Sequence, residues 1–296
     1  FQQEIVQFLV QGYSDGTTPL PCSRCNRAVK FRPMLDWAAR ERGIERVATG
    51  HYARLRPSPS GGRTQLLRGL DARKDQSYFL YDLPQTVLQR LVFPLGELTK
   101  PDTRAEAGRL GLRTAEKPES QDLCLADHHG SMKAFLDAYL PERPGEIVLG
   151  DGRVVGQHDG IEHFTIGQRR GLGVALGHPI FVVDRIPDTN TVVVGPRDRL
   201  ASKGLFAKET NWLIDPPPTG STLRCQAKIR YNADPVPAEV VRHEGDGFEV
   251  QFDAPQDAVA PGQACVLYDE AADQVLGGGW IERSRAVENV APSVTR

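Results

Sequence analysis

Three cysteines stand where the sequence pattern predicts loops or the start of a helix. Cys22 and Cys25 form a C-x-x-C pair, and Cys124 follows in a polar stretch 99 residues after Cys25. Such a pair can be half of a zinc site, a redox couple, or a nucleophile beside an incidental neighbour. The spacing alone leaves all three chemistries open.

The charges around Cys25 favour a reactive thiol. Arg24, Arg27 and Lys30 surround this residue in sequence, and nearby cations stabilise a thiolate. The competing interpretation is a small buried side chain at a helix start, which is how most free cysteines behave. Cys225 and Cys265 lie within apolar strand patterns, and we interpret both as core residues.

A structural zinc site is a further alternative. Zinc needs four ligands in such sites, and the sequence has no second C-x-x-C pair. Cys124 and His128 could complete a set of three cysteines and one histidine with Cys22 and Cys25.

The first part of the chain, which contains Cys22 and Cys25, has the pattern of alternating helices and strands. An amphipathic helix opens the chain, and a second helix is expected around 30–42, before Gly43. A short apolar run at 46–49 then ends at Gly50 and His51. This is one helix-then-strand step of a parallel sheet, and ligands gather beyond the carboxyl ends of such strands. A helix at 101–110 is expected to begin with a capping box formed by Thr103 and Glu106.

Further along the chain the pattern becomes rich in β-structure. Residues 56–65 are expected to form a hairpin tip, and short strands punctuated by Gly, Asp or Asn follow from about 145. The last section alternates apolar and polar residues at the spacing of a small antiparallel barrel. Its expected strands are 222–231, 236–242, 247–253, 263–268 and 274–283.

Composition narrows the class of protein. The 296 residues are 40% hydrophobic and 25% charged, which suits two or three globular domains. No apolar stretch is long enough to span a membrane and no signal peptide precedes the first helix, so we expect a cytoplasmic protein. A net charge of −2 argues against a protein that coats nucleic acid indiscriminately. Residues 200–296 carry a net charge of −5 and residues 1–199 carry +3, so an RNA surface is expected toward the front.

Eight short motifs, in order, resemble those of the tRNA-specific 2-thiouridylases, and together they span nearly the whole chain. They are Cys25-Asn26-x-x-Val29-Lys30-Phe31, Ala48-Thr49-Gly50-His51-Tyr52, the run from Leu67 to Leu80, Phe93-Pro94-Leu95-Gly96, the run from Thr165 to Gly173, Arg230-Tyr231, Pro261-Gly262-Gln263, and Leu276-Gly277-Gly278-Gly279.

The resemblance implies a sulfur transfer that uses ATP, with Mg²⁺ expected beside it. The C2 oxygen of the wobble uridine would be adenylated and then replaced by sulfur from a cysteine persulfide. Cys25 matches the nucleophile, and Cys124 matches the cysteine that carries the persulfide. Transfer would leave a Cys25–Cys124 disulfide. Gly50 matches a glycine at the ATP site, where the absence of a side chain lets the backbone approach a nucleotide.

The resemblance also implies contacts with tRNA. The segment Leu20, Pro21 and Cys22 matches the region near the target base, and Gln168-Arg169-Arg170 is a further candidate contact. The expected partners are tRNAs of the Lys, Glu and Gln types and a protein that donates persulfide sulfur. The positions that match tRNA-contacting residues are His51, Lys74, Asp75, Gln76, Arg230, Tyr231 and Gln263.

Two departures from the family pattern qualify these expectations. The Ser-Gly-Gly-Val-Asp-Ser loop that grips ATP phosphates is missing, and we interpret the chain as truncated at its N-terminus. Leu20 also stands where family members have asparagine. The expected fold is therefore α/β, with part of an adenine-nucleotide α-hydrolase-like parallel sheet at 1–128, a β-rich tRNA-binding module at 129–199 and an antiparallel β-barrel at 200–296. The alternative functions are a non-catalytic tRNA-binding derivative and a zinc-stabilised structural protein.

Overall fold

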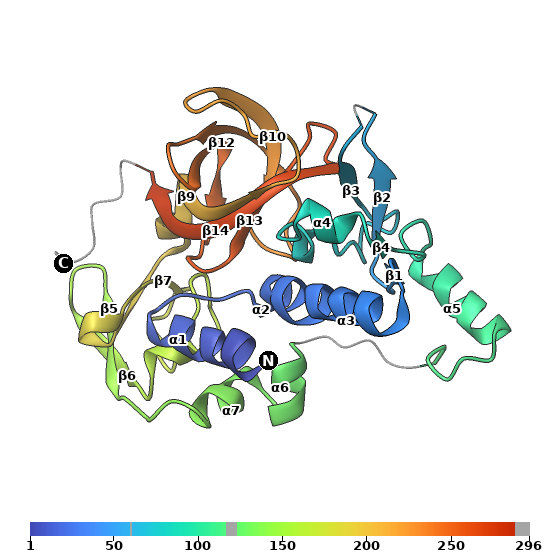
Figure 1. The fold of residues 1–296 in the computed structure, drawn as a ribbon. Coiled ribbons are helices and arrows are strands. Elements are labelled where there is room, and N and C mark those ends of the chain that lie inside the picture. Colours follow the sequence, from blue (N-terminus) through green and yellow to red (C-terminus); the bar gives the residue numbers. More distant parts are fainter. Residues whose placement is uncertain (60, 117–122, 288–296) are drawn as a thin grey trace.

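The computed structural model describes residues 1–59, 61–116 and 123–287. Two helical stretches open the chain and lie below the C-terminal barrel in Figure 1. The second ends at Gly43, whose φ of +63° is the left-handed conformation of a common helix stop. The first comprises η1 (Gln2–Gln7) and α1 (Phe8–Ser14), and the second comprises α2 (Pro21–Arg24), η2 (Cys25–Phe31) and α3 (Arg32–Arg42).

A parallel strand pair follows, as the sequence predicts. Strands β1 (Val47–Ala48) and β4 (Leu91–Val92) pair in parallel. The predicted hairpin also forms, from β2 (Ala53–Pro57) and β3 (Thr64–Arg68). The chain between this hairpin and β4 contains η3 (Ser77–Phe79) and α4 (Gln85–Leu88).

Helix α5 (Lys100–Arg109) forms where it is expected, but its predicted cap is wrong. The capping box pairs Thr99 with Asp102, one turn earlier than the expected Thr103 and Glu106. Glu106 instead pairs with Arg109 on the same helix. Thr99 is favoured because its extended backbone can end the preceding loop, whereas Thr103 already lies inside the helix.

The middle of the chain contains two short helices and a four-stranded sheet. The strands lie in the order β6-β5-β8-β7; β5 and β8 are parallel, and the other pairs are antiparallel. Its apolar side chains form a separate core around Ile147, Val182 and Val192. The elements are α6 (Cys124–His129), α7 (Met132–Asp137), β5 (Gly145–Leu149), β6 (Val154–His158), η4 (Ile161–His163), β7 (Phe181–Ile186), η5 (Pro187–Thr189), β8 (Thr191–Gly195) and η6 (Arg197–Leu200).

A closed six-stranded antiparallel barrel completes the fold. It closes because β13 pairs with both β10 and β14. The five expected strands all form, and the sequence interpretation missed a sixth, β9 (Ala201–Trp212), which pairs with β12 and β14. The other strands are β10 (Thr222–Lys228), β11 (Val236–Arg242), β12 (Gly247–Asp257), β13 (Ala264–Tyr268) and β14 (Gln274–Ala286).

The barrel and the N-terminal hairpin share one sheet. The start of β14 pairs with β3, through Gln274 opposite Leu67 and Val275 opposite Leu66. In Figure 1 the long β14 ribbon accordingly runs from the barrel toward β3. One apolar core includes side chains from both sides of this junction, among them Tyr78 and Tyr268. None of the described helices is long and apolar enough to cross a membrane.

Candidate functional site

The C-x-x-C pair lies on a single helix. Pro21 occupies the first turn of α2, a position that needs no backbone N–H donor. Cys22 and Cys25 are three residues apart, so their side chains lie on one face. From Cys25 the helix widens to π-type hydrogen bonding, a local geometry that is frequent at functional sites.

Cys124 is the first residue of α6, where the sequence interpretation expected a loop, and its side chain is exposed. An apolar cluster holds α6 and α7 against the N-terminal helices: Leu125 and Cys25 both pack on it, around a core that includes Leu9 and Phe135. Burial is the main reason why the pKa values of Cys22 and Cys25 are raised, and a charge on Cys124 would add to this effect, so the three thiols lie within electrostatic reach of one another. All five cysteines are free.

The sequence left a thiolate and a small buried side chain both open at Cys25, and its surroundings in the structure favour the neutral thiol. Burial raises the pKa of the Cys25 thiol, and Lys30 only partly offsets this effect. Burial likewise raises the pKa of Cys22 to about 11. The two arginines are engaged elsewhere, because Arg24 pairs with Glu4 at 3.0 Å and Arg27 pairs with the buried Asp82 at 2.7 Å.

The zinc alternative lacks its set of ligands. Within residues 1–59, 61–116 and 123–287, no group of three or more His, Cys, Asp or Glu side chains is placed to hold a metal ion. His128 lies on α6 with Cys124 and is exposed, and its ring packs edge-on against the His129 ring.

Gly50 and His51 follow β1 at its carboxyl end. Gly50 is exposed, and a Cβ added there would meet only Leu95, at 3.5 Å, so its backbone is open to approach. The His51 ring packs between Phe31 and Phe93, and its Nδ1 lies 2.9 Å from Thr49 Oγ1. Burial and Lys30 lower the pKa of His51 to about 4, so this side chain is neutral at pH 7.

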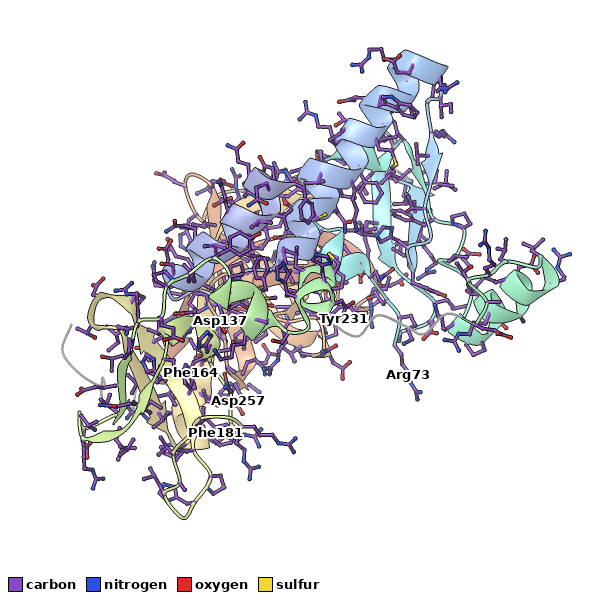
Figure 2. The ribbon with its side chains drawn as sticks, turned by 90° about the horizontal axis from the view of Figure 1, so that it is seen from below. Arg73, Asp137, Phe164, Phe181, Tyr231 and Asp257 are labelled. Carbon is purple, nitrogen blue, oxygen red and sulfur yellow. The ribbon has the colours of Figure 1, made fainter. Side chains whose placement is uncertain are left out.

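The run from Lys74 to Gln76 divides into inward and outward residues. The Asp75 carboxylate is buried and forms an ion pair with Arg68 at 3.1 Å. Gln76 binds the backbone of Tyr52 through both its side chain and its own N–H. Lys74 is half-buried, and Arg73, which the sequence interpretation passed over, points away from the body in Figure 2.

Tyr231 belongs to an aromatic group at the junction of the N-terminal part and the barrel. Its ring lies 4.5 Å from the Phe79 ring, at an interplanar angle of 34°. The Lys228 ammonium lies 5.5 Å from the Tyr231 ring centroid and is itself buried. Arg230 is exposed, and its guanidinium donates to the Asp257 carbonyl at 3.3 Å. Figure 2 shows Tyr231 on the side of the molecule from which Arg73 projects.

Gln263 and the segment before Cys22 meet in the structure. The Gln263 amide donates to the Thr18 carbonyl at 2.8 Å. Leu20 and Pro21 are buried, whereas Cys22 is half-buried. In the central module, Gln168 shapes its own loop through Thr165 N and Arg170 O, each at 3.0 Å. Arg169 and Arg170 are exposed there.

Sequence reasoning missed Phe79, Arg73 and Lys228 at this site. It also missed Arg185 on β7, whose guanidinium donates to the Thr18 hydroxyl at 2.9 Å. Phe79 and Arg73 lie inside or beside motifs that were singled out, and the motif position alone could have suggested them. Lys228 follows Arg224 and Gln226 on its strand, and Arg185 follows Asp184, so neither cation stood out from its strand in the sequence. A charge at an inward strand position is uncommon unless it has a specific partner.

The comparisons with known proteins cover most of the chain. Residues 1–128 match the tRNA methyl transferase HUP domain, residues 133–196 match the tRNA methyl transferase PRC-barrel domain, and residues 202–281 match the Aminomethyltransferase beta-barrel domain. The tRNA-specific 2-thiouridylase MnmA of Synechococcus sp. (strain RCC307) is 67% identical over 293 residues, which cover 95% of this chain and 76% of the relative.

Two further relatives carry the same name. The protein of Synechococcus sp. (strain CC9605) is 61% identical, over 96% of this chain and 76% of its own length. The protein of Prochlorococcus marinus (strain MIT 9303) is 56% identical, over 96% of this chain and 74% of its own length. At this identity and coverage, the chain belongs to the tRNA-specific 2-thiouridylase family.

Proposed function

We propose that this chain replaces the C2 oxygen of a wobble uridine in tRNA with sulfur, using Cys25 and Cys124 as the reacting thiols. One observation carries the proposal: an apolar cluster brings the Cys25 helix and α6, which begins at Cys124, into one environment. Cys124 is exposed and can accept sulfur from a donor protein, whereas Cys25 is half-buried.

The sulfur transfer balances with these two thiols. A persulfide on Cys124 holds the sulfur that will enter the base. The Cys25 thiolate attacks the Cys124 sulfur atom, and hydrosulfide leaves and displaces the activated oxygen at C2 of the uridine. A Cys25–Cys124 disulfide remains and takes two electrons from a thiol reductant to begin the next cycle. Burial raises the pKa of Cys25, which favours its neutral thiol over the attacking thiolate, and Lys30 partly offsets this effect.

Gly50 fits a nucleotide site, since its backbone is exposed at the carboxyl end of β1. ATP bound there would supply the adenylyl group that turns the C2 oxygen into a good leaving group. The neutral His51 beside it can offer a hydrogen bond to RNA without adding a charge.

The tRNA would lie across the side of the molecule that carries Arg73 and Tyr231. Arg73, Lys74 and Arg230 suit phosphate contacts, and the Tyr231 ring on Phe79 suits a stacked base. Asp75 and Gln76 hold the loop that presents these cations. Leu20 and Pro21 shape the wall near the target base. We divide the chain into units at 1–128, 129–199 and 200–296 and place the protein in the cytoplasm, with tRNAs of the Lys, Glu and Gln types as substrates.

Peptide mass spectrometry tests the proposal. The reduced protein is exposed to a persulfide donor, digested, and the modified cysteine is located. We expect a persulfide on Cys124 in the Cys25→Ser variant, a Cys25–Cys124 disulfide in the unaltered protein, and the same products with Cys22→Ala. If neither Cys25 nor Cys124 reacts, the result favours a non-catalytic tRNA-binding protein. If both cysteines hold zinc, the result favours a zinc-stabilised structural protein.

A further inference from the structure

The segment that leads to the thiol helix is held between the central module and the barrel. It runs from Gly16 to Leu20, between α1 and α2. A Cβ added to Gly16 would lie 2.6 Å from Pro187 of the central module. A Cβ added to Gly262 of the barrel would lie 2.9 Å from the Thr18 nitrogen. The segment therefore touches both modules at close range.

Thr18 is bonded at three of its atoms. Its N–H donates to the Pro261 carbonyl at 2.7 Å, and its own carbonyl accepts from the Gln263 amide at 2.8 Å. Its hydroxyl accepts from Arg185 Nη2 at 2.9 Å. Two of these contacts come from the barrel and the third comes from the central module. A backbone position held from two other modules has little freedom to move.

Arg185 is a buried cation whose hydrogen-bond acceptors carry no charge. It lies on β7 with only 5% of its surface exposed. Its guanidinium donates to two uncharged oxygens, the Phe164 carbonyl at 2.6 Å and the Thr18 hydroxyl. Its Nε is buried without a hydrogen-bond partner among the residues that the structure describes. Burying a charge in this way is costly, and an apolar side chain would pack here more cheaply.

The link from Thr18 to the thiols is short and stiff. Pro19 and Pro21 restrict the backbone on either side of Leu20, because proline fixes φ. Leu20 is buried and stands at the N-terminal end of α2, which carries Cys22 and leads directly to Cys25. A displacement of Thr18 would therefore move the thiol helix rather than be absorbed by a loop.

We infer that Arg185, Thr18 and Gln263 form a clamp that positions the thiol helix, so that the two proposed tRNA-binding modules set the placement of Cys22 and Cys25. The three are positioning residues, because none of them touches the reacting sulfur atoms. The inference rests on the proposed role of Cys25. In the clamp, Gln263 positions the thiol helix instead of contacting tRNA. Loss of a positioning residue lowers kcat, whereas loss of a tRNA contact raises KM.

The test compares Thr18→Val with Thr18→Ser in tRNA thiolation assays with ATP and a persulfide donor. Valine keeps the shape of threonine but removes the acceptor of the Arg185 bond, whereas serine keeps the hydroxyl. We expect Thr18→Val to lower kcat at least about tenfold, since misplacing reacting groups by ~1 Å can cost about 100-fold. The KM for tRNA should stay within about twofold, and Thr18→Ser should restore kcat. Thr222→Val, at an exposed position on β10, is the matched control and should behave as the unaltered protein.

Two outcomes overturn the clamp: a raised KM with unchanged kcat in Thr18→Val, or a Thr18→Ser variant no more active than Thr18→Val. If Thr18→Val does not fold, Gln263→Ala gives the same decision, because a clamp residue lowers kcat whereas a tRNA contact raises KM. Cys25→Ser separates this inference from the proposed function. Thiolation that survives Cys25→Ser refutes the proposed mechanism, whereas an inactive Cys25→Ser beside a fully active Thr18→Val refutes the clamp alone.

Discussion

The Asp75 carboxylate lies against the Arg68 guanidinium, with Oδ2 3.1 Å from Nε, and the Asp75 side chain is only 1% exposed. Its other oxygen accepts from the backbone N–H groups of Gly69 and Ser77, each at 3.0 Å. The Ser77 hydroxyl also donates to this carboxylate. Asp75 therefore fixes both ends of the loop that carries Arg73 and Lys74.

Replacing Asp75 should lower stability more than it lowers affinity for tRNA. Asp75→Ala leaves the Arg68 charge without its partner and removes the acceptor for two backbone N–H groups. We expect the free energy of unfolding to fall by about 3–5 kcal/mol, as when one partner of a buried ion pair is removed. Urea unfolding measures this change, with Asp71→Ala in the same loop as the comparison. A loss below ~1 kcal/mol would mean that the pair does not hold the loop.

Arg73 should contribute to tRNA binding through charge alone. Arg73→Ala should weaken binding and reduce the slope of log K against log salt concentration by about one, as the loss of one phosphate contact does. Binding titrations at several salt concentrations give this slope. Arg40→Ala on α3 removes another exposed arginine, which pairs with Glu41, and it should leave the slope unchanged. Equal slopes for both variants would place Arg73 outside the RNA surface.

Tyr231 should bind RNA through its ring. Tyr231→Leu removes the stacking face above Phe79, and we expect a loss of about 1–3 kcal/mol in binding free energy, the usual value for one stacked base. Tyr231→Phe keeps the ring and should bind within about twofold of the unaltered protein. The affinity of each variant for tRNA is measured by fluorescence titration. If Tyr231→Phe binds as weakly as Tyr231→Leu, the hydroxyl rather than the ring makes the contact.

Cys25 should react slowly at neutral pH. Burial raises its pKa, so its rate of alkylation should still be rising with pH at about pH 9. Lys30 opposes this effect, and Lys30→Met should therefore slow alkylation further at any pH below the pKa. Arg32→Met is the control, because the Arg32 side chain is exposed and lies beside the exposed Asp36. Peptide mass spectrometry of iodoacetamide-treated protein follows Cys25 separately. A rate that levels off below pH 8 would show a lowered pKa.

Stability should fall on acidification partly because of His51. Its pKa is lowered to about 4 in the folded protein, so the unfolded chain binds the proton more readily. The stability that this group contributes is present above about pH 6.5 and is lost as the pH falls toward 4, with a slope of up to about 1.4 kcal/mol per pH unit. Asp82, whose pKa is raised to about 6, acts in the opposite sense in this range.

The His51→Gln variant isolates this effect. Its free energy of unfolding should change less between pH 7 and pH 5 than that of the unaltered protein, because one titrating group has been removed. Urea unfolding at the two pH values gives the difference. A loss as steep in His51→Gln as in the unaltered protein would show that the His51 ring titrates normally.

Local patterns in the sequence predicted most elements of the fold. The barrel strands are bounded by Gly, Pro and Asp turns, and alternation along them marks the buried face. Strand β9 escaped because Gly204 and Lys208 interrupt its apolar residues, and because the strand is defined by pairing with the distant β12 and β14. The β3–β14 pairing was equally hidden, since it joins residues about 200 positions apart.

The site was harder to predict from residue types than from resemblance. The number of cations around Cys25 suggested a thiolate. The ionisation of this thiol also depends on its burial and on whether those cations already form ion pairs with carboxylates. Asp75 looked like part of an exposed polar run until its four hydrogen-bond donors were located. Arg185 carries no local signal that it reaches Thr18, which is 167 residues earlier. These relationships are set by tertiary packing, which a single sequence does not display.

The pairing of β3 with β14, and of Thr18 with the loop at 261–263, also bears on how the protein is made. A ribosome completes residues 1–68 long before it adds Gln263 and Val275, so Cys22 and Cys25 emerge before the barrel residues that bond to their part of the chain. Contacts of such long sequence separation form late and slowly. The contacts that we propose to hold the thiol helix in place can therefore form only after the loop at 261–263 has been made, and the β3–β14 pairing only after residue 275.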